Sequence, residues 1–95
     1  MGLFVLIGRD GAQGAALRKL HREAHLANLR PLAEQDRVVY AGPLLDDGGA
    51  PCGSVVVFAA ESPAAAHAFA ASDPYVVHGI FERWEVLASK QVFPA

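Results

Sequence analysis

Apolar and polar positions along the chain divide it into strand-like and helix-like segments. Residues 2–8 (GLFVLIG) are apolar throughout, which is typical of a strand buried on both faces or nearly so. Residues 37–42 (RVVYAG), closed by Gly42-Pro43, and residues 54–60 (SVVVFAA) predict two more strands. The valine run favours a central place in a sheet for the latter strand. Between these two strands, residues 46–53 (DDGGAPCG) have the composition of a loop.

A last strand is predicted over residues 80–88 (IFERWEVLA), where apolar and charged residues alternate. The alternation places Ile80, Glu82, Trp84 and Val86 on one face of the strand, and Phe81, Arg83, Glu85 and Leu87 on the other. Trp84 is therefore expected to pack on a sheet face, and at a subunit interface if the protein is oligomeric.

Two segments have the composition of helices. Residues 12–34 are rich in good helix formers, and at about 100° per residue one half of this helix carries Leu17, Leu20, His21, Ala24, His25, Asn28, Leu29 and Leu32. Pro31 predicts a bend near residues 27–30, or an early end and a restart, because a proline inside a helix costs about 3 kcal/mol. A second helix is predicted to begin at Ser62-Pro63 and to end at Asp73-Pro74.

The resulting order, βαββαβ, predicts an α+β protein with the ferredoxin-like arrangement. Residues 1–95 are expected to form a single domain, with a four-stranded antiparallel sheet and both helices on one face. The other face of such a sheet stays uncovered, although its strands are apolar. Two sheets packed face to face, as in a dimeric α/β-barrel assembly, would cover it. We therefore expect a homodimer.

The composition narrows the class of protein. With 53% hydrophobic and 19% charged residues the chain is not disordered, and it is apolar for its size, which also favours a second subunit. The net charge is -2 and the Lys and Arg residues are scattered, so nucleic-acid binding is not expected. The apolar start is too short to span a membrane and has no basic leader, so we expect a cytoplasmic protein. Cys52, the only cysteine, is expected to be an incidental thiol.

Two histidines, His21 and His25, lie four residues apart on one predicted helix face. They are packed core residues, a metal pair or a general base in a pocket. A metal pair is disfavoured because Arg22 follows the first histidine, where zinc-binding helices carry glutamate, and no third ligand is apparent. His67 and His78 are expected at the surface. We expect neither a metal nor another cofactor.

Asp73 offers a carboxylate partner for a histidine base. In a ferredoxin-like layout the two helices lie side by side, so an acid at the end of one could meet a histidine of the other and fix its tautomer. The alternative is that Asp73 only caps the turn of residues 74–77. The residues alone leave both interpretations open.

Several blocks of the chain, in order, resemble a known family. They are Arg22-x-x-His25-Leu26, Ala41-Gly42-Pro43, Gly53-Ser54 and Asp73-Pro74-Tyr75, within REAHLANL, RVVYAGPL, GSVVVF and SDPYVVHGIFERWEV. Together they are similar to the YciI-like (YCII-related) family over nearly the whole chain. The resemblance implies a ferredoxin-like protomer, a dimer built by sheet packing, and a site centred on His25 and Asp73. This family includes a dehydrochlorinase that acts on a chlorinated hydroxyquinol. His21 is not part of its pattern.

Other residues of these blocks are candidates for substrate binding. Arg22 could bind a carboxylate or a phenolate, or remain a surface arginine, and Tyr75 could offer its hydroxyl or merely pack. Ser54 could donate a hydrogen bond into the same cavity. Gly42 and Pro43 are expected to shape the backbone around the pocket.

We hypothesise a small cofactor-independent enzyme in which His25, oriented by Asp73, transfers a proton on a small cyclic or aromatic substrate, leading to elimination or isomerisation. A non-catalytic module that binds a small molecule on the same fold is the main alternative. A haem or quinol oxygenase is a third, less favoured because no axial ligand or conduit for electrons is apparent.

Overall fold

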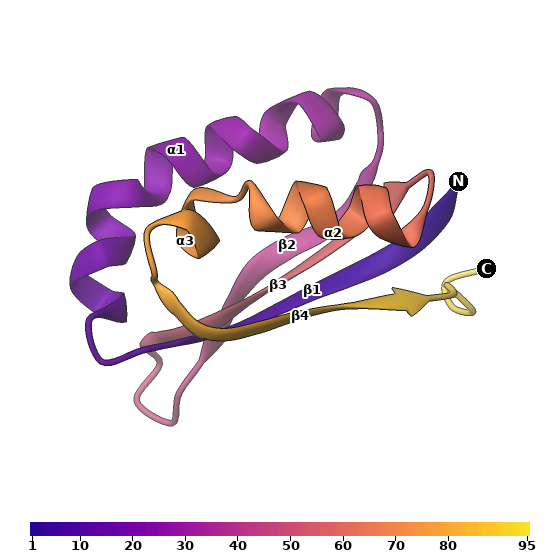
Figure 1. The fold of residues 1–95 in the computed structure, drawn as a ribbon. Helices are drawn as coiled ribbons and strands as arrows, with labels where there is room; N and C mark the ends of the chain where they lie inside the picture. Colours follow the sequence, from indigo (N-terminus) through magenta and orange to yellow (C-terminus); the bar gives the residue numbers. More distant parts are fainter.

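The structure, a computed structural model, describes residues 1–95. Its elements are β1 (Gly2–Asp10), α1 (Gly14–Glu34), β2 (Val38–Leu45), β3 (Pro51–Ala60), α2 (Pro63–Ala71), α3 (Pro74–Val77) and β4 (Phe81–Ser89) (Figure 1). None of the helices combines the length and the apolar composition that a membrane span requires.

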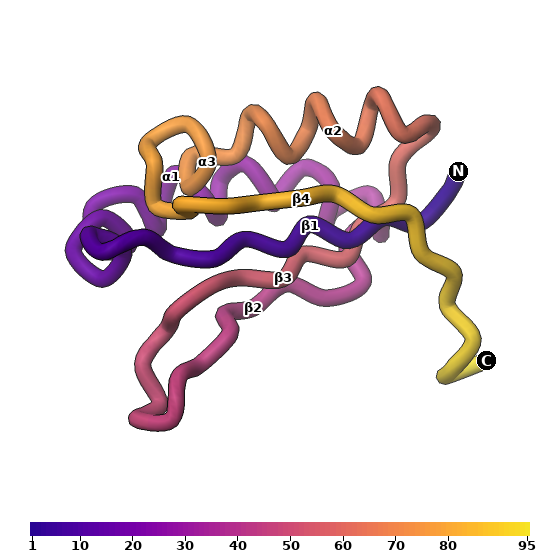
Figure 2. The backbone as a smooth tube through the Cα atoms, turned by 60° about the horizontal axis from the view of Figure 1, so that its bottom comes forward, coloured from indigo at the N-terminus to yellow at the C-terminus, as the bar shows by residue number.

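The sheet confirms the predicted fold class. Its strands lie in the order β2-β3-β1-β4, and every neighbouring pair is antiparallel. All the helices lie on one side of the sheet, as Figures 1 and 2 show from two directions. This is the ferredoxin-like α+β arrangement, with the short α3 added between α2 and β4.

The core lies between the sheet and the helices. Its strand residues alternate along β1 and β3, which places them on the helix side: Phe4, Leu6, Val56, Phe58 and Ala60 are buried there against Leu29 of α1 and Ala66 and Ala70 of α2. On the opposite face, Leu3, Val5 and Ile7 of β1 are only half-buried. The prediction that this strand is buried on both faces or nearly so therefore holds for the helix side alone, and the other face is only half-buried in a single chain.

The first helix corrects two predictions. It runs without interruption to Glu34, so it does not end and restart at Pro31. Pro31 lies in the last turn and is exposed, so the helix loses one hydrogen bond, to the carbonyl of Ala27, with only three residues left to follow. The predicted apolar half also shifts, because Leu20 is 75% exposed while His25 and Leu29 are buried.

The β2–β3 hairpin is longer than the sequence pattern indicated. Gly42-Pro43 does not close the second strand, which continues to Leu45. Because β2 is an edge strand, a proline can sit in it without breaking a ladder on both sides. β3 begins at Pro51, so only a tight turn remains of the predicted loop, and Asp46 holds that turn by accepting hydrogen bonds from two of its N–H groups. The prediction that the valine-rich strand is internal is confirmed.

The last strand departs from strict alternation at its start. An irregularity in the pairing at Arg9 and Asp10 turns Phe81 toward the core, where it packs with Ile80 and Tyr75. The prediction that Phe81 faces away from Ile80 is therefore wrong. Trp84 lies on the helix side, 5.1 Å from the ring of His67 in α2, rather than on the open face where a second sheet could pack.

Candidate functional site

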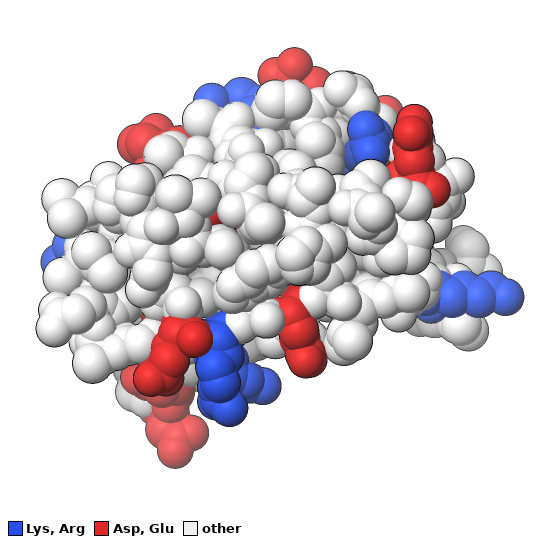
Figure 3. Space-filling model, viewed as in Figure 1, with Lys and Arg blue, Asp and Glu red and all other residues white.

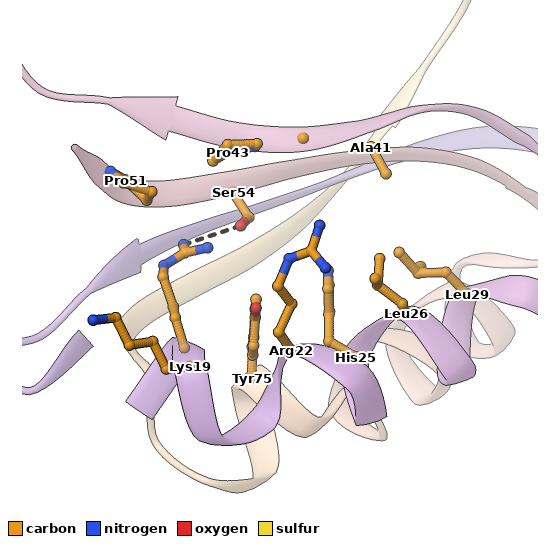
Figure 4. Close-up of a pocket in the computed structure, with 12 residues that line it drawn as sticks. Lys19, Arg22, His25, Leu26, Leu29, Ala41, Pro43, Pro51, Ser54 and Tyr75 are labelled. Carbon is orange, nitrogen blue, oxygen red and sulfur yellow. Dashed lines mark hydrogen bonds between the residues drawn. The ribbon is translucent and has the colours of Figure 1, made fainter. Parts of the chain in front are cut away.

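A cavity of about 300 Å³ lies between α1, α3 and the β2–β3 hairpin (Figure 4). Polar side chains from α1, β3 and α3 line it together with apolar ones: Arg18, Lys19, Arg22, His25, Ser54 and Tyr75 are the polar residues, and Leu26, Leu29, Ala41, Gly42, Pro43 and Pro51 complete the wall. Figure 4 shows the sheet forming one side of the cavity and the helix the other. The size suits a compact small molecule, since ligand pockets begin at about 300 Å³.

His25 and Asp73 form a buried pair beside this cavity. The His25 ring nitrogen Nδ1 lies 2.9 Å from both carboxylate oxygens of Asp73. Asp73 is fully buried and does not line the cavity, whereas His25 is 8% exposed and does line it. The packing of α1 against α3 brings the two residues together across 48 positions of sequence.

Asp73 performs both functions that the sequence left open. Besides contacting His25, its Oδ1 accepts a hydrogen bond from the Tyr75 backbone N–H at 2.8 Å and so caps α3. Pro74 at the first helical position fits this start of a helix. The cap fixes the carboxylate, and the fixed carboxylate then holds the imidazole.

The same contacts indicate the tautomer of His25. An ionised carboxylate only accepts hydrogen bonds, so in the neutral imidazole Nδ1 carries the proton and donates it to Asp73. The lone pair then lies on Nε2, the ring nitrogen that Asp73 does not contact. This arrangement can accept a proton from a bound molecule, and the adjacent carboxylate stabilises the imidazolium that forms.

Tyr75 packs directly on the histidine. Its ring is stacked on the His25 ring, with centroids 4.0 Å apart and planes 5° from parallel, and it lies nearly perpendicular to the Phe81 ring. Burial raises the pKa of the Tyr75 phenol, and the negative charge of Asp73 adds to this effect, while the charges of Arg18 and Arg22 partly oppose it. The hydroxyl therefore keeps its proton at neutral pH.

Sequence reasoning missed two cations of the cavity wall, Arg18 and Lys19, and the expectation that Lys19 lies on the opposite half of the helix is wrong. The Arg18 Nε and Nη2 donate to the two carboxylate oxygens of Asp10, at the end of β1, at 2.6 and 2.8 Å. The same Nη2 donates to Ser54 Oγ at 3.0 Å, and the guanidinium carbon lies 5.0 Å from the centroid of the Tyr75 ring. Burial alone would lower the pKa of Arg18, but the hydrogen bond and charge of Asp10 outweigh it, and the pKa is raised.

A signal for Arg18 is present in the sequence. Arg18, Arg22 and His25 are spaced by four and three residues, which places them on one stripe of a helix. The stripe that lines the cavity is thus rotated from the apolar half that leucine positions suggested, and it includes the charged residues.

The remaining candidate residues also meet at the cavity. Arg22 extends between the helix and the sheet (Figure 4) and has no hydrogen bond or ion pair with the rest of the chain. Ser54 lies on β3 and is 3% exposed, with its hydroxyl bonded to Arg18. Gly42 and Pro43 contribute part of the β2 wall.

The other histidines lie outside the cavity. His21 stacks on His78, with centroids 4.0 Å apart and planes 7° from parallel, and His67 lies on α2 beside Trp84. His21 therefore does not line the pocket. No three or more His, Cys, Asp or Glu side chains are grouped as metal ligands would be, and Cys52 is exposed and unpaired.

Fold and site together define a class of protein, in which a ferredoxin-like fold encloses a small cavity beside a buried histidine–aspartate pair. Residues 2–90 match the YCII-related domain, and the chain belongs to this family, as its sequence blocks predicted. It is 39% identical over 97 residues to Protein YciI of Escherichia coli, a match that covers 96% of this chain and 99% of that protein.

Solved structures extend the comparison. The chain is similar to the 5-chloro-2-hydroxyhydroquinone dehydrochlorinase TftG of Burkholderia phenoliruptrix, solved in complex with 2,5-dihydroxybenzoquinone. The two share 30% identity and a TM-score of 0.84, over 94% of each chain. An uncharacterized NIPSNAP domain protein of Burkholderia xenovorans shares the fold alone, at 17% identity and a TM-score of 0.55 over 100% of this chain and 98% of that one.

Proposed function

We propose that this protein is a small cofactor-independent enzyme in which His25, oriented by Asp73, transfers a proton on a small cyclic or aromatic substrate. The observation that carries the proposal is the contact of Nδ1 with a fully buried carboxylate, at 2.9 Å, on a histidine that lines a cavity. A core histidine would need a hydrogen-bond partner but no cavity, and a binding module would need no orienting carboxylate.

The reaction class we propose is elimination of the dehydrochlorinase type, with isomerisation as the related possibility. The chlorinated hydroxyquinol would first pass to its keto tautomer, in which a hydroxyl proton has moved to the carbon that bears chlorine. Nε2 of His25 would then take the proton of another hydroxyl, whose oxygen forms a carbonyl as the ring π bond shifts toward the chlorinated carbon. Chloride leaves that carbon with the electron pair of its bond. The products are a hydroxyquinone and HCl, so the step needs no oxidant or reductant. The dehydrochlorinase activity of the similar TftG supports this choice.

The polar wall would hold the substrate during this step. Arg22, whose guanidinium is not paired within the chain, would bind a substrate oxygen, and the Tyr75 hydroxyl would donate to another. Ser54 would donate into the same cavity. Pro43 and the backbone of Gly42 would shape the opposite wall.

The test is release of chloride from 5-chloro-2-hydroxyhydroquinone, with matched histidine variants. We expect His25→Gln to lower turnover about 100-fold or more, and Asp73→Asn to lower it less. His21→Gln, on the same helix but outside the cavity, should stay within about twofold of the unaltered chain. Full activity in His25→Gln would refute the proposal. Binding of the compound without any chloride release would favour the alternative, a non-catalytic module that binds a small molecule.

We also propose that the protein is a homodimer joined through the open face of its sheet. This face carries Leu3, Val5 and Ile7 of β1, Val55, Val57 and Ala59 of β3, and the exposed Tyr40 and Leu87. Such a continuous apolar face is unfavourable in water, and a second sheet packed on it would remove it from solvent.

A further inference from the structure

The polar wall of the cavity carries an excess of positive charge. Arg18, Lys19 and Arg22 line it, and no carboxylate does. Asp10 is bound to Arg18, and the buried Asp73 behind His25 offsets one more cation, so with neutral His25 one positive charge of the three remains in excess. The excess is local, because the whole chain has a net charge of -2. On the face shown in Figure 3, charged side chains of both signs are scattered and no area of one sign stands out.

Nearly every polar group of the wall is also a hydrogen-bond donor. Lysine and arginine side chains can only donate. Ser54 Oγ already accepts from Arg18, which leaves its own proton to donate to a ligand. The buried Tyr75 hydroxyl keeps its proton. Nε2 of His25 is the one group that only accepts, and the Ser54 and Tyr75 oxygens can accept as well as donate, so donors outnumber acceptors in this wall.

We infer that the cavity binds a compact oxyanion about the size of one ring, and that Lys19 and Arg22 select it by its charge. The oxygens of an anion can accept hydrogen bonds from the donors of this wall. A neutral ligand instead presents its own hydroxyl protons to these donors, and most of those protons would find no acceptor. This inference deepens the proposed function, since it names the chemical class of substrate for the same cavity. The inference requires only that the anion binds, whereas the proposed function requires turnover, so one can fail while the other holds.

Calorimetric binding of two non-reacting ring compounds tests the inference. The first probe is 2,5-dihydroxybenzoquinone, whose hydroxyl groups are ionised at neutral pH because each negative charge is shared with a conjugated carbonyl oxygen. The second is hydroquinone, which has a similar ring and stays neutral. We expect the anion to bind at least about tenfold more tightly than hydroquinone, and its binding to weaken as salt is added.

Variants of Lys19 and Arg22 test whether these two side chains cause the preference for the anion. Arg22→Gln and Lys19→Gln should each weaken binding of the anion, by about tenfold for Arg22, and weaken binding of hydroquinone by a smaller factor. Arg30→Gln is the matched control, an exposed arginine on the same helix that does not line the cavity, and should stay within about twofold. Equal or tighter binding of hydroquinone, no binding of the anion, or equal losses in the Arg22 and Arg30 variants would overturn the inference.

Discussion

A single carboxylate connects local structure to chemistry in this protein. Asp73 caps α3 through the Tyr75 N–H and holds Nδ1 of His25, and it is fully buried while doing so. A buried carboxylate is costly unless its oxygens are hydrogen-bonded, and both bonds meet that requirement. The orientation of the histidine therefore depends on the start of a four-residue helix that lies far from it in sequence.

The phenol of Tyr75 should titrate late. Because burial raises its pKa, the Tyr40→Phe variant, in which Tyr75 is the only tyrosine left, should form phenolate with a midpoint above about 10 in an ultraviolet titration. The folded state then holds this proton more tightly than the unfolded chain does. The stability gained is present below about pH 10 and is lost as the pH rises through the folded pKa. A midpoint below about 10 would contradict the described environment of the ring.

At the residue scale, the sequence could predict only part of the site. The spacing of the histidines and the Asp-Pro break indicated His25 and Asp73 as candidates, and the family blocks singled them out. It could not decide whether Asp73 caps a turn or meets a histidine, because that depends on how α1 and α3 pack. Arg18 was missed because its partners, Asp10 and Ser54, come together only in the folded sheet.

Replacing Asp73 should reduce stability more than the loss of a helix cap alone, because Asp73 also joins α3 to α1 through His25. Asp73→Ala removes the cap of α3, worth about 1 kcal/mol, and leaves the buried His25 Nδ1 without a partner, which costs about 1–3 kcal/mol more. Urea unfolding should therefore show a loss of about 2–4 kcal/mol in the free energy of unfolding.

Ser62→Ala supplies the matched control for this loss. Ser62 caps α2 by accepting from the Ala65 N–H and has no further partner, so its replacement should cost about 1 kcal/mol. Equal losses in the two variants would mean that the His25 contact contributes nothing to stability.

Element boundaries were less predictable than element types, because tertiary context decides them. Pro31 suggested a break, but its place in the exposed last turn of α1 lets the helix continue. Gly42-Pro43 suggested the end of a strand, yet pairing with β3 extends β2 to Leu45. The sheet face on which the Phe81 side chain lies depends on an irregularity in the β1–β4 pairing, and no local sequence pattern indicates this irregularity.

At the scale of the whole molecule, the order of the strands and the two long helices was predictable from composition, helix starts and stops, and the alternation in residues 80–88. β1 shows the limit of this approach, because its residues are apolar throughout and cannot indicate that one face is only half-buried. The sequence pattern also does not identify what covers that face.

If the protein forms a dimer through the open sheet face, its mass in sedimentation should depend on the residues of that face. The unaltered chain should sediment with twice the mass of one chain, and Val57→Lys, in the middle of that face, should shift it to the monomer because a charge would be buried there. Leu20→Lys changes a leucine that is 75% exposed on α1, away from the face, and should leave the mass unchanged. A monomer in the unaltered chain, or a dimer that survives Val57→Lys, would contradict this arrangement.

The account depends most on the free nitrogen of His25, and nitrogen NMR of histidine-labelled protein measures it directly. The His25 signals are assigned by their loss in His25→Gln, and the spectrum is recorded with the ring in its neutral form. We predict a proton on Nδ1 and an unprotonated Nε2, as donation to Asp73 requires. A proton on Nε2 instead would leave no base at the cavity and would contradict the proposed mechanism.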